Sequence, residues 1–331
     1  MQAVVLVGGF GTRLRPLTAT RPKQMLPVAN RPMIERVVEH LGRHGVTRAV
    51  LSLGYRPDAF LEAYPDGHCA GVELHYAVEP EPLDTAGAIR FAALDGQVTE
   101  RFVVMNGDVL TDLDLGALLA FHHDRGAEGT LALHRVADPS AYGVVPTDRD
   151  GRVVAFIEKP PAGQAPTDLI NAGTYVLEPS VLDRIEPDQR VNVERVTFPA
   201  MAADGTLFAR DGDAYWIDAG TPDTYLAANL DLVNGRRVPA EQGVHPDAEV
   251  DGAVVGAVVG AGARIGAGAV VSASVLLPGA EVGAGASVSD SIMGAGSRLG
   301  EGATVQGGSV LGDGVVVEPG ATLTGARVPE P

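Results

Sequence analysis

A glycine-rich segment followed by a run of cations lies near the start of the chain. Gly8, Gly9 and Gly11 come after Ala3–Val7, whose β-branched residues predict a strand. No acidic residue precedes Glu35, whereas five cations do: Arg13, Arg15, Arg21, Lys23 and Arg31. Glycine amides and neighbouring cations can both bind phosphate oxygens. In a chain with a net charge of −17, this local positive charge predicts an anion site.

The segment does not match the two common phosphate-binding motifs. Lys23 follows Pro22 and is not followed by Ser or Thr, which excludes a P-loop. Counted from Gly9, the third glycine of a dinucleotide-binding fingerprint would fall on Leu14. A glycine turn with solvated arginines stays open as the alternative to a phosphate site.

The distribution of lysines favours the functional interpretation. Of the 25 basic residues, only Lys23 and Lys159 are lysines, and both lie in loops next to a proline. A compact ammonium is needed where the planar guanidinium of Arg does not fit. Chance retention of two surface lysines is the alternative.

The elements that must position these groups alternate between strands and helices. The pattern predicts strands over Ala3–Val7, Arg48–Leu53 and Phe102–Met105, and helices over Pro32–His44, Ala86–Leu94 and Leu115–His123. Such alternation is typical of an α/β fold with a mostly parallel sheet. Ligands bind beyond the carboxyl ends of such strands. Gly8-Gly9 and Asp108 each follow a predicted strand, and we expect them to share one crevice.

Composition changes near residue 246. All aromatic residues lie at or before Tyr225, and residues 246–331 contain 19 of the 42 glycines. Asn234–Asp247, with two glycines and two prolines, is typical of a connector. We therefore place a domain boundary there.

The tail has a hexad period. Its aliphatic positions are Val259, Ile265, Val271, Leu277, Val282, Val288, Met293, Leu299, Val305, Leu311, Val317 and Leu323. A regular period argues against a flexible Gly/Ala linker and favours a solenoid. The tail resembles the hexapeptide-repeat, left-handed parallel β-helix family, in which twelve hexads form about four coils.

Charge and cysteine content exclude other classes. The chain has 25 basic and 42 acidic residues, which argues against a partner that is a nucleic acid or an anionic membrane. The single cysteine, Cys69, excludes an internal disulfide and favours a reducing compartment. The N-terminus lacks the pattern of a signal peptide, and the repeat accounts for the apolar stretch 253–277. We expect a soluble, cytoplasmic protein.

Several motifs together resemble the sugar-1-phosphate nucleotidyltransferases. They are Gly8–Asn30, Asn106–Asp108, Tyr142–Val145, Glu158–Pro160, Asn171–Gly173 and Trp216–Pro222, in family order. The resemblance implies a Rossmann-like nucleotidyltransferase domain over 1–235, a linker over 236–247 and a hexapeptide-repeat left-handed β-helix over 248–331. It also implies transfer of a nucleotidyl group from an NTP to a sugar 1-phosphate, with release of pyrophosphate and with Mg²⁺ as cofactor.

Site roles follow from the same resemblance. The catalytic residues would be Arg13, Lys23, Asp108, Lys159 and Asp218, with Asp108 and Asp218 binding the metal. The nucleotide would contact Leu6, Gly8, Gly9, Gly11, Thr12, Arg13, Lys23, Glu79, Pro82, Asp84, Gly87, Gly107 and Asp108. The sugar phosphate would contact Tyr142, Gly143, Glu158, Lys159, Asn171 and Gly173. For Asn171 a purely structural turn is the alternative.

The residue at the base-reading position favours GTP. Thymidylyl- and uridylyl-type members usually have Gln where this chain has Glu79. A carboxylate only accepts hydrogen bonds, and guanine offers two adjacent donors, N1–H and N2–H₂. The glycine-rich segment also resembles mannose-1-phosphate guanylyltransferases most, which favours mannose 1-phosphate and GDP-mannose. Two residues keep other substrates open: Asp84, in place of a usual Gly, and Gln24. The alternatives are a thymidylyltransferase acting on glucose 1-phosphate and another sugar-1-phosphate nucleotidyltransferase, of the adenylyl, cytidylyl or uridylyl type.

Two other functional classes remain as alternatives. A non-catalytic regulatory paralogue that binds an NDP-sugar should have lost a phosphate cation or a metal carboxylate, and this chain retains them. Acyltransferases with hexad domains typically use a histidine on the β-helix, and residues 246–331 contain none. Stacked coils present flat faces, so we expect the tail to support a homo-oligomer, with binding of an effector as the alternative.

Overall fold

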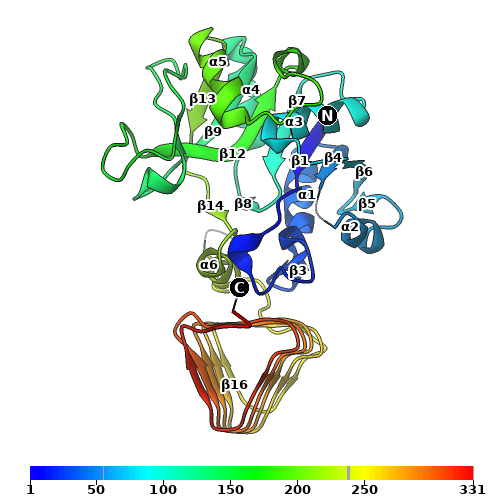
Figure 1. Ribbon diagram of the computed structural model, residues 1–331, viewed down its shortest axis with the longest axis vertical. Helices are drawn as coiled ribbons and strands as arrows, with labels where there is room; N and C mark the ends of the chain where they lie inside the picture. The colour runs from blue at the N-terminus through cyan, green and yellow to red at the C-terminus, as the bar shows by residue number, and fades with distance from the viewer. Residues whose placement is uncertain (55, 237–238, 331) are drawn as a thin grey trace. The chain divides into compact units, whose positions relative to one another are not determined.

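We describe the chain from a computed structural model, in which residues 1–54, 56–236 and 239–330 are described (Figure 1). Residues 237–238 of the expected linker and Pro331 of the expected β-helix domain lie outside the described residues. Contacts group the chain into two compact units: unit 1 comprises 1–9 and 35–216, and unit 2 comprises 10–34 and 217–331. The loop 10–34 therefore belongs with the tail. The domain boundaries expected from composition stay a prediction.

The central sheet of unit 1 is built on four parallel strands. β1 (Gln2–Leu6) lies between β4 (Arg48–Leu53) and β7 (Phe102–Asn106), and β6 (Val72–Val78) pairs with β4. Residues 3–5 of β1 are fully buried, because helices and loops cover both faces of a parallel sheet. The predicted mostly parallel α/β sheet is confirmed.

Antiparallel strands extend this sheet beyond β7. The long β12 (Leu169–Leu177) pairs with β7, β9 and β10, all antiparallel. The remaining strands of unit 1 are β5 (His68–Cys69), β8 (Val109–Thr111), β9 (Gly129–Arg135), β10 (Gly143–Val144), β11 (Ile157–Glu158) and β13 (Leu207–Asp211). β14 (Trp216–Asp218) marks the passage of the chain from unit 1 to unit 2.

The three helices expected from the sequence are present. They are α1 (Met33–Arg43), α3 (Asp84–Asp95) and α4 (Leu115–Arg125), and α2 (Asp58–Ala63) and α5 (Phe198–Ala203) are shorter. The chain passes from β1 to β4 and β6 on one side and then returns to β7 on the other. This reversal is a topological switch point, where open α/β sheets bind their ligands.

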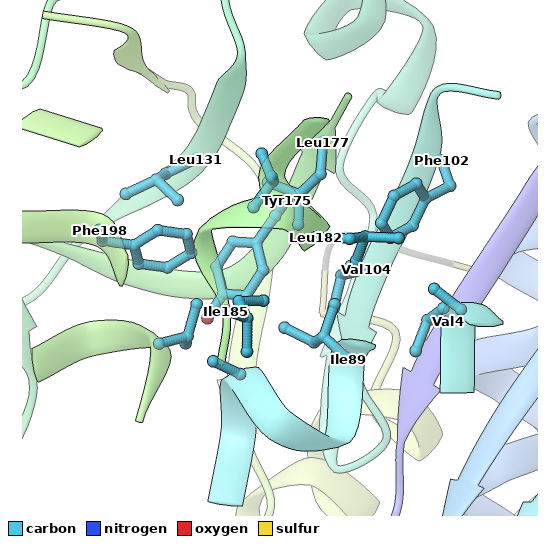
Figure 2. Packing of buried hydrophobic residues seen from close by; sticks show 14 of the residues in the cluster. Val4, Ile89, Phe102, Val104, Leu131, Tyr175, Leu177, Leu182, Ile185 and Phe198 are labelled. Carbon is cyan, nitrogen blue, oxygen red and sulfur yellow. The ribbon is translucent and has the colours of Figure 1, made fainter. Parts of the chain in front are cut away.

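A cluster of apolar side chains packs the sheet of unit 1 against its helices (Figure 2). Val104 and Tyr175 come from the neighbouring strands β7 and β12, and Phe198 comes from α5. The rings of Tyr175 and Phe198 meet edge to face, with centroids 5.0 Å apart. This packing fixes β12, whose first half carries residues of the candidate site.

The non-repetitive part of unit 2 combines the loop 10–34 with one helix. The loop contains single 3-10 turns at Thr12–Leu14 and Lys23–Met25 and the short pair β2 (Pro27–Val28) and β3 (Arg31–Pro32). The helix is α6 (Pro222–Val233), whose Asn229 Oδ1 accepts from the Ala29 amide at 2.8 Å. The Tyr225 hydroxyl, also on α6, donates to the Pro27 carbonyl. The loop is therefore fastened to α6.

The tail forms three parallel five-stranded sheets, the arrangement of a left-handed β-helix, and Figure 1 shows its triangular coils. The first sheet contains β15 (Glu249–Val250), β18 (Arg264–Ile265), β21 (Glu281–Val282), β24 (Arg298–Leu299) and β27 (Val316–Val317). The second contains β16 (Ala253–Val255), β19 (Val270–Ser272), β22 (Ser287–Ser289), β25 (Thr304–Gln306) and β28 (Thr322–Thr324). The third contains β17 (Val258–Val259), β20 (Val275–Leu276), β23 (Ile292–Met293), β26 (Val310–Leu311) and β29 (Arg327–Val328).

Two details of the predicted repeat were wrong. Five strands in each sheet make five coils rather than about four, because the first coil begins before Val259. The strand register places Leu276, not Leu277, in line with Val259 and Met293. Leu277 is buried as well, at 1% exposure, so two adjacent aliphatic residues fit the hexad period equally well.

Candidate active site

Two of the expected nucleotide-binding segments leave the sheet side by side. Leu6 of β1 is in register with Asn106 of β7, and the Gly107 amide donates to the Leu6 carbonyl at 2.9 Å. Gly8 and Asp108 therefore follow adjacent parallel strands at the switch point, as the sequence predicts. Asp108 is 8% exposed, so its carboxylate lies at the edge of the core.

Glu79 is held beside Gly8 in unit 1. Its Oε1 accepts from the Ser52 hydroxyl at 2.9 Å, and its Oε2 accepts from the Leu83 amide at 3.1 Å. A Cβ added to Gly8 would lie 3.4 Å from Glu79 Oε1, so Gly8 leaves the carboxylate room. Each carboxylate oxygen can accept more than one hydrogen bond. These two hydrogen bonds therefore orient Glu79, and its carboxylate can still accept further hydrogen bonds.

Asp84 and Gly87 lie in the first turn of α3. Asp84 has φ +59°, the left-handed conformation that favours Gly but that Asp tolerates. Its Oδ1 accepts from the Thr85 amide at 2.7 Å and from Asn192 Nδ2 at 3.1 Å. A Cβ on Gly87 would lie 2.7 Å from the Gln189 carbonyl oxygen, so α3 packs closely there. The exposed Pro82 precedes this turn.

The expected sugar-phosphate residues meet across short strands of unit 1. Gly143 of β10 pairs with Glu158 of β11, and the Lys159 amide donates to the Tyr142 carbonyl at 3.0 Å. Lys159 Nζ lies 3.5 Å from Glu158 Oε1. The Lys159 side chain is 61% exposed, which leaves its ammonium available to a ligand. The two motifs, separated in the sequence, therefore form one cluster.

Asn171 and Gly173 of β12 make a turn next to this cluster. Asn171 Oδ1 accepts from the Gly173 amide at 3.0 Å, and its Nδ2 donates to the Tyr175 hydroxyl at 2.9 Å and to Glu194 Oε1 at 3.1 Å. Gly173 has φ +70°, and a Cβ there would lie 2.5 Å from Asn106 Nδ2. These bonds give Asn171 a structural role, and its contact with sugar stays a prediction.

Glu194 belongs to this cluster and was missed by the sequence analysis. Burial, and then the nearby charge of Glu158, raise the pKa of Glu194 to about 6. Carboxyl groups with raised pKa values are typical of functional sites. Glu194 lies outside every motif quoted from the sequence, so its connection to the site comes from the fold, through its hydrogen bond with Asn171 and its proximity to Glu158.

Trp216 packs within unit 1. Its Nε1 donates to the Ala172 carbonyl at 2.9 Å, and its ring stacks on His134 with centroids 5.2 Å apart. Tyr142 meets the same indole edge to face, at 5.7 Å between centroids. The indole thereby supports Tyr142 and the turn after Asn171.

The part of the glycine-rich segment that belongs to unit 2, from residue 10 on, is closed by a hydrogen bond. Gly11 has φ +63°, and its carbonyl accepts from the Thr18 hydroxyl at 2.7 Å. A Cβ at Gly11 would lie 3.3 Å from the Cβ of Lys23. This close approach requires glycine, and it brings Lys23 against the loop that contains Thr12.

Arg13 and Asp218 face each other in the same unit. Arg13 Nη2 lies 3.7 Å from Asp218 Oδ2, with the two side chains 63% and 24% exposed. A Cβ on Gly220 would lie 2.6 Å from Asp218 Oδ1 and 2.8 Å from Arg13 Nη2, so Gly220 makes room for both. The pair joins a cation and a carboxylate that the sequence assigns to the phosphates and the metal.

The two expected metal carboxylates belong to different units, Asp108 to unit 1 and Asp218 to unit 2. Among the described residues, no group of three or more His, Cys, Asp or Glu side chains could hold a metal ion by itself. One or two carboxylates that share the ion with substrate phosphates are the usual arrangement for Mg²⁺. Each of the two carboxylates is by itself a ligand of the type that Mg²⁺ prefers when phosphates supply the other oxygens.

A family model for nucleotidyl transferases matches residues 2–235. The chain belongs to the nucleotidyl transferase family. A second model, for the GMPPB C-terminal domain, matches residues 238–331. Enzymes of the nucleotidyl transferase family generally use a divalent metal.

Similar curated proteins share this family. A mannose-1-phosphate guanylyltransferase of Mycobacterium tuberculosis is 43% identical over 83% of this chain and 79% of its own length. The catalytic subunit beta of Dictyostelium discoideum mannose-1-phosphate guanylyltransferase is 41% identical over 69% of this chain. The match spans 63% of that protein's length.

Among solved structures, HddC from Yersinia pseudotuberculosis is similar to this nucleotidyl transferase. It is 31% identical, with a TM-score of 0.60, and the match covers 69% of this chain and 97% of HddC. HddC has also been solved in complex with GMP-PN, with the same scores. Within the described residues, none of the helices has the length and apolar character needed to cross a membrane.

Proposed function

We propose that this nucleotidyl transferase transfers a guanylyl group from GTP to mannose 1-phosphate, giving GDP-mannose and pyrophosphate. The observation that carries the proposal is the 41–43% identity to proteins named mannose-1-phosphate guanylyltransferases. The similarity to HddC, which binds GMP-PN, supports a nucleotide site in the same domain.

The displacement needs no nucleophilic side chain. A phosphate oxygen of the sugar 1-phosphate is already an anion and attacks the α-phosphorus of GTP. The bond from the α-phosphorus to the bridging oxygen breaks, and pyrophosphate leaves opposite the attacking oxygen. Catalysis then consists of positioning two anionic reactants and stabilising charge on the leaving group.

Each described cluster has a task in this scheme. The amides of Gly8–Thr12, with Arg13 and Lys23, hold the triphosphate and stabilise the departing pyrophosphate. Lys159 holds the sugar phosphate, and Glu158 and Glu194 accept hydrogen bonds from sugar hydroxyls. Asp108 and Asp218 would hold Mg²⁺, which supplies charge neutralisation between the phosphates when bound.

Glu79 supports guanine over the pyrimidine bases. Ser52 and Leu83 fix both of its oxygens while leaving lone pairs for N1–H and N2–H₂ of guanine. Gln24, the residue in common with thymidylyltransferases, is only 1% exposed and therefore does not present its amide to a base.

A pyrophosphate-release assay tests the proposal. The purified chain is given each of GTP, dTTP, UTP, ATP and CTP with mannose 1-phosphate or glucose 1-phosphate, with Mg²⁺ or with EDTA. We expect turnover that is highest with GTP and mannose 1-phosphate and abolished by EDTA. Preferred use of dTTP and glucose 1-phosphate would reassign the substrates. NDP-sugar binding without turnover of any pair would identify a regulatory paralogue.

A further inference from the structure

One corner of the β-helix departs from its repeat at Asp313. The third sheet turns there through equivalent positions of successive coils, occupied by Ala261, Pro278, Ala295 and Asp313. The turns are linked by backbone bonds, such as the Gly314 amide donating to the Ala295 carbonyl at 2.8 Å. Three coils make this turn with Ala or Pro, so the turn itself does not require a carboxylate.

The Asp313 carboxylate instead joins the β-helix to the loop 10–34, within unit 2. Its Oδ1 accepts from the Ala295 amide at 2.9 Å, which holds the side chain against the preceding coil. Its Oδ2 accepts from the Thr20 hydroxyl at 2.7 Å and from Arg21 Nη2 at 2.6 Å. The Arg21 and Asp313 side chains are only 29% and 20% exposed. A partly buried, charge-assisted bond of this kind is stronger than an ordinary surface ion pair.

The adjacent Gly312 allows the coil to approach the loop. A Cβ there would lie 3.1 Å from the Cβ of Pro16 and 3.2 Å from Cδ of Pro329. The loop thus touches the β-helix at Pro16 as well as at Thr20 and Arg21. Asp313 is more than 290 positions away from Thr20 and Arg21 in the sequence.

The anchored residues lie between two groups of the candidate site. Thr18, which closes the glycine-rich loop on Gly11, precedes Thr20, and Lys23 follows Arg21 by two residues. Asp313 also neutralises Arg21, which otherwise could compete with Lys23 for phosphate oxygens. One carboxylate of the tail therefore contributes to both the position and the charge of the segment at Thr20 and Arg21.

We propose that Asp313 is a positioning residue of the NTP site: it fixes Thr20 and Arg21 and thereby places Lys23 and the loop closed by Thr18. The proposal rests on the proposed function, because it assigns the loop to the triphosphate.

The test compares Asp313→Asn and Asp313→Ala with Glu301→Gln and Glu301→Ala. Glu301 occupies the same place in a Leu-Gly-acid-Gly turn, at another corner of the β-helix, with an exposed side chain. Full-length variants are assayed for KM of each substrate, kcat, Tm and amide hydrogen exchange of residues 10–26. Wild-type turnover is measured first, with the NTP and sugar phosphate that it prefers.

We expect Asp313→Ala to raise KM for the NTP about 10-fold and to speed exchange over residues 17–24. KM for the sugar phosphate, the exchange rates of the coils and both Glu301 variants should stay within 2-fold of wild type. Asp313→Glu should restore part of the NTP affinity. In a double-mutant cycle, Arg21→Ala and Asp313→Ala should be less than additive.

An equal rise of both KM values together with a lower Tm would overturn the proposal, since it would show a general structural effect. Unchanged KM for the NTP and unchanged exchange over 17–24 would also overturn it. An inactive wild type would refute the proposed function alone, because hydrogen exchange still reports whether Asp313 orders the loop.

Discussion

Strands in unit 1 and strands in the β-helix carry polar groups in different places. In unit 1, Gly8, Glu79 and Asp108 stand just beyond the carboxyl ends of strands, where loops of unequal length can bring different groups together. In the described part of the tail, the buried polar side chains are all serines: Ser274, Ser291, Ser297 and Ser309. A repeat gives every coil similar side chains, whereas a topological switch point brings loops with different side chains close together. Asp313 is informative because it breaks the repeat where the tail contacts the loop 10–34.

The largest expected effect is a loss of turnover, without a loss of stability, when a carboxylate just after a strand of unit 1 is removed. Asp108→Asn removes a carboxylate charge assigned to the metal, so we expect kcat to fall by about 10³-fold or more while Tm stays close to wild type. Asp124→Asn, at the exposed end of α4, is the control and should retain full activity. Near-normal turnover of Asp108→Asn would remove Asp108 from the metal assignment.

The matching change in the tail should affect stability and not substrate selection. Leu311→Ala opens a cavity among fully buried side chains and should lower the free energy of unfolding by about 3 kcal/mol. Val316→Ala, at a side chain that is 64% exposed, should change it by less than about 0.5 kcal/mol. Denaturant titration measures both, and equal losses would contradict the burial pattern.

Base selection is the next smaller effect. Glu79→Gln replaces a group that only accepts by an amide that also donates, so the ratio of kcat/KM for GTP to that for dTTP should fall about 10-fold. The exposed Glu81→Gln serves as the control. An unchanged ratio would place guanine recognition on other residues.

A pH dependence of stability at Glu194 should be similar in size to the effect at Glu79. Its pKa of about 6 lies above the usual value of 4.5, so the folded state retains the proton that the unfolded state releases. Stability contributed by this group is full below about pH 4.5 and declines as the pH rises to about 6. Glu194→Gln should therefore raise Tm at pH 8 more than at pH 4.5, by an amount equivalent to about 1–2 kcal/mol.

Thermal unfolding of Glu194→Gln and wild type across pH 4–8 checks this expectation. Glu186→Gln, at an exposed position, is the control and should show the same pH profile as wild type. A Tm difference that is independent of pH would mean that the Glu194 carboxyl does not titrate as its burial implies.

The sequence predicted regular features better than contacts made by the fold. The hexad period predicted a solenoid, which the resemblance to hexapeptide-repeat proteins narrowed to a β-helix. The positions just after strands placed Gly8 and Asp108 together, and both predictions depend on local patterns. The hexad pattern placed Leu277 at the position in line with Val259 that Leu276 occupies. Both residues are aliphatic, and only the backbone pairing of the strands distinguishes them. Glu194 and Asp313 escaped notice because their significance comes from partners that only the fold brings near them. Glu194 contacts Asn171, 23 positions away, and Asp313 contacts Thr20 and Arg21, nearly 300 positions away.

The grouping of residues 10–34 with the tail has a consequence for engineering this enzyme. A truncation at the change in composition, near residue 246, would leave the strands of the central sheet intact. It would remove the Asp313 carboxylate, which accepts from Thr20 and Arg21, and the close approach of Gly312 to Pro16. Grafting a foreign solenoid would have the same defect unless it supplied an acid at that corner. In a chimeric protein, the tail and the loop 10–34 should therefore be exchanged together, as one unit.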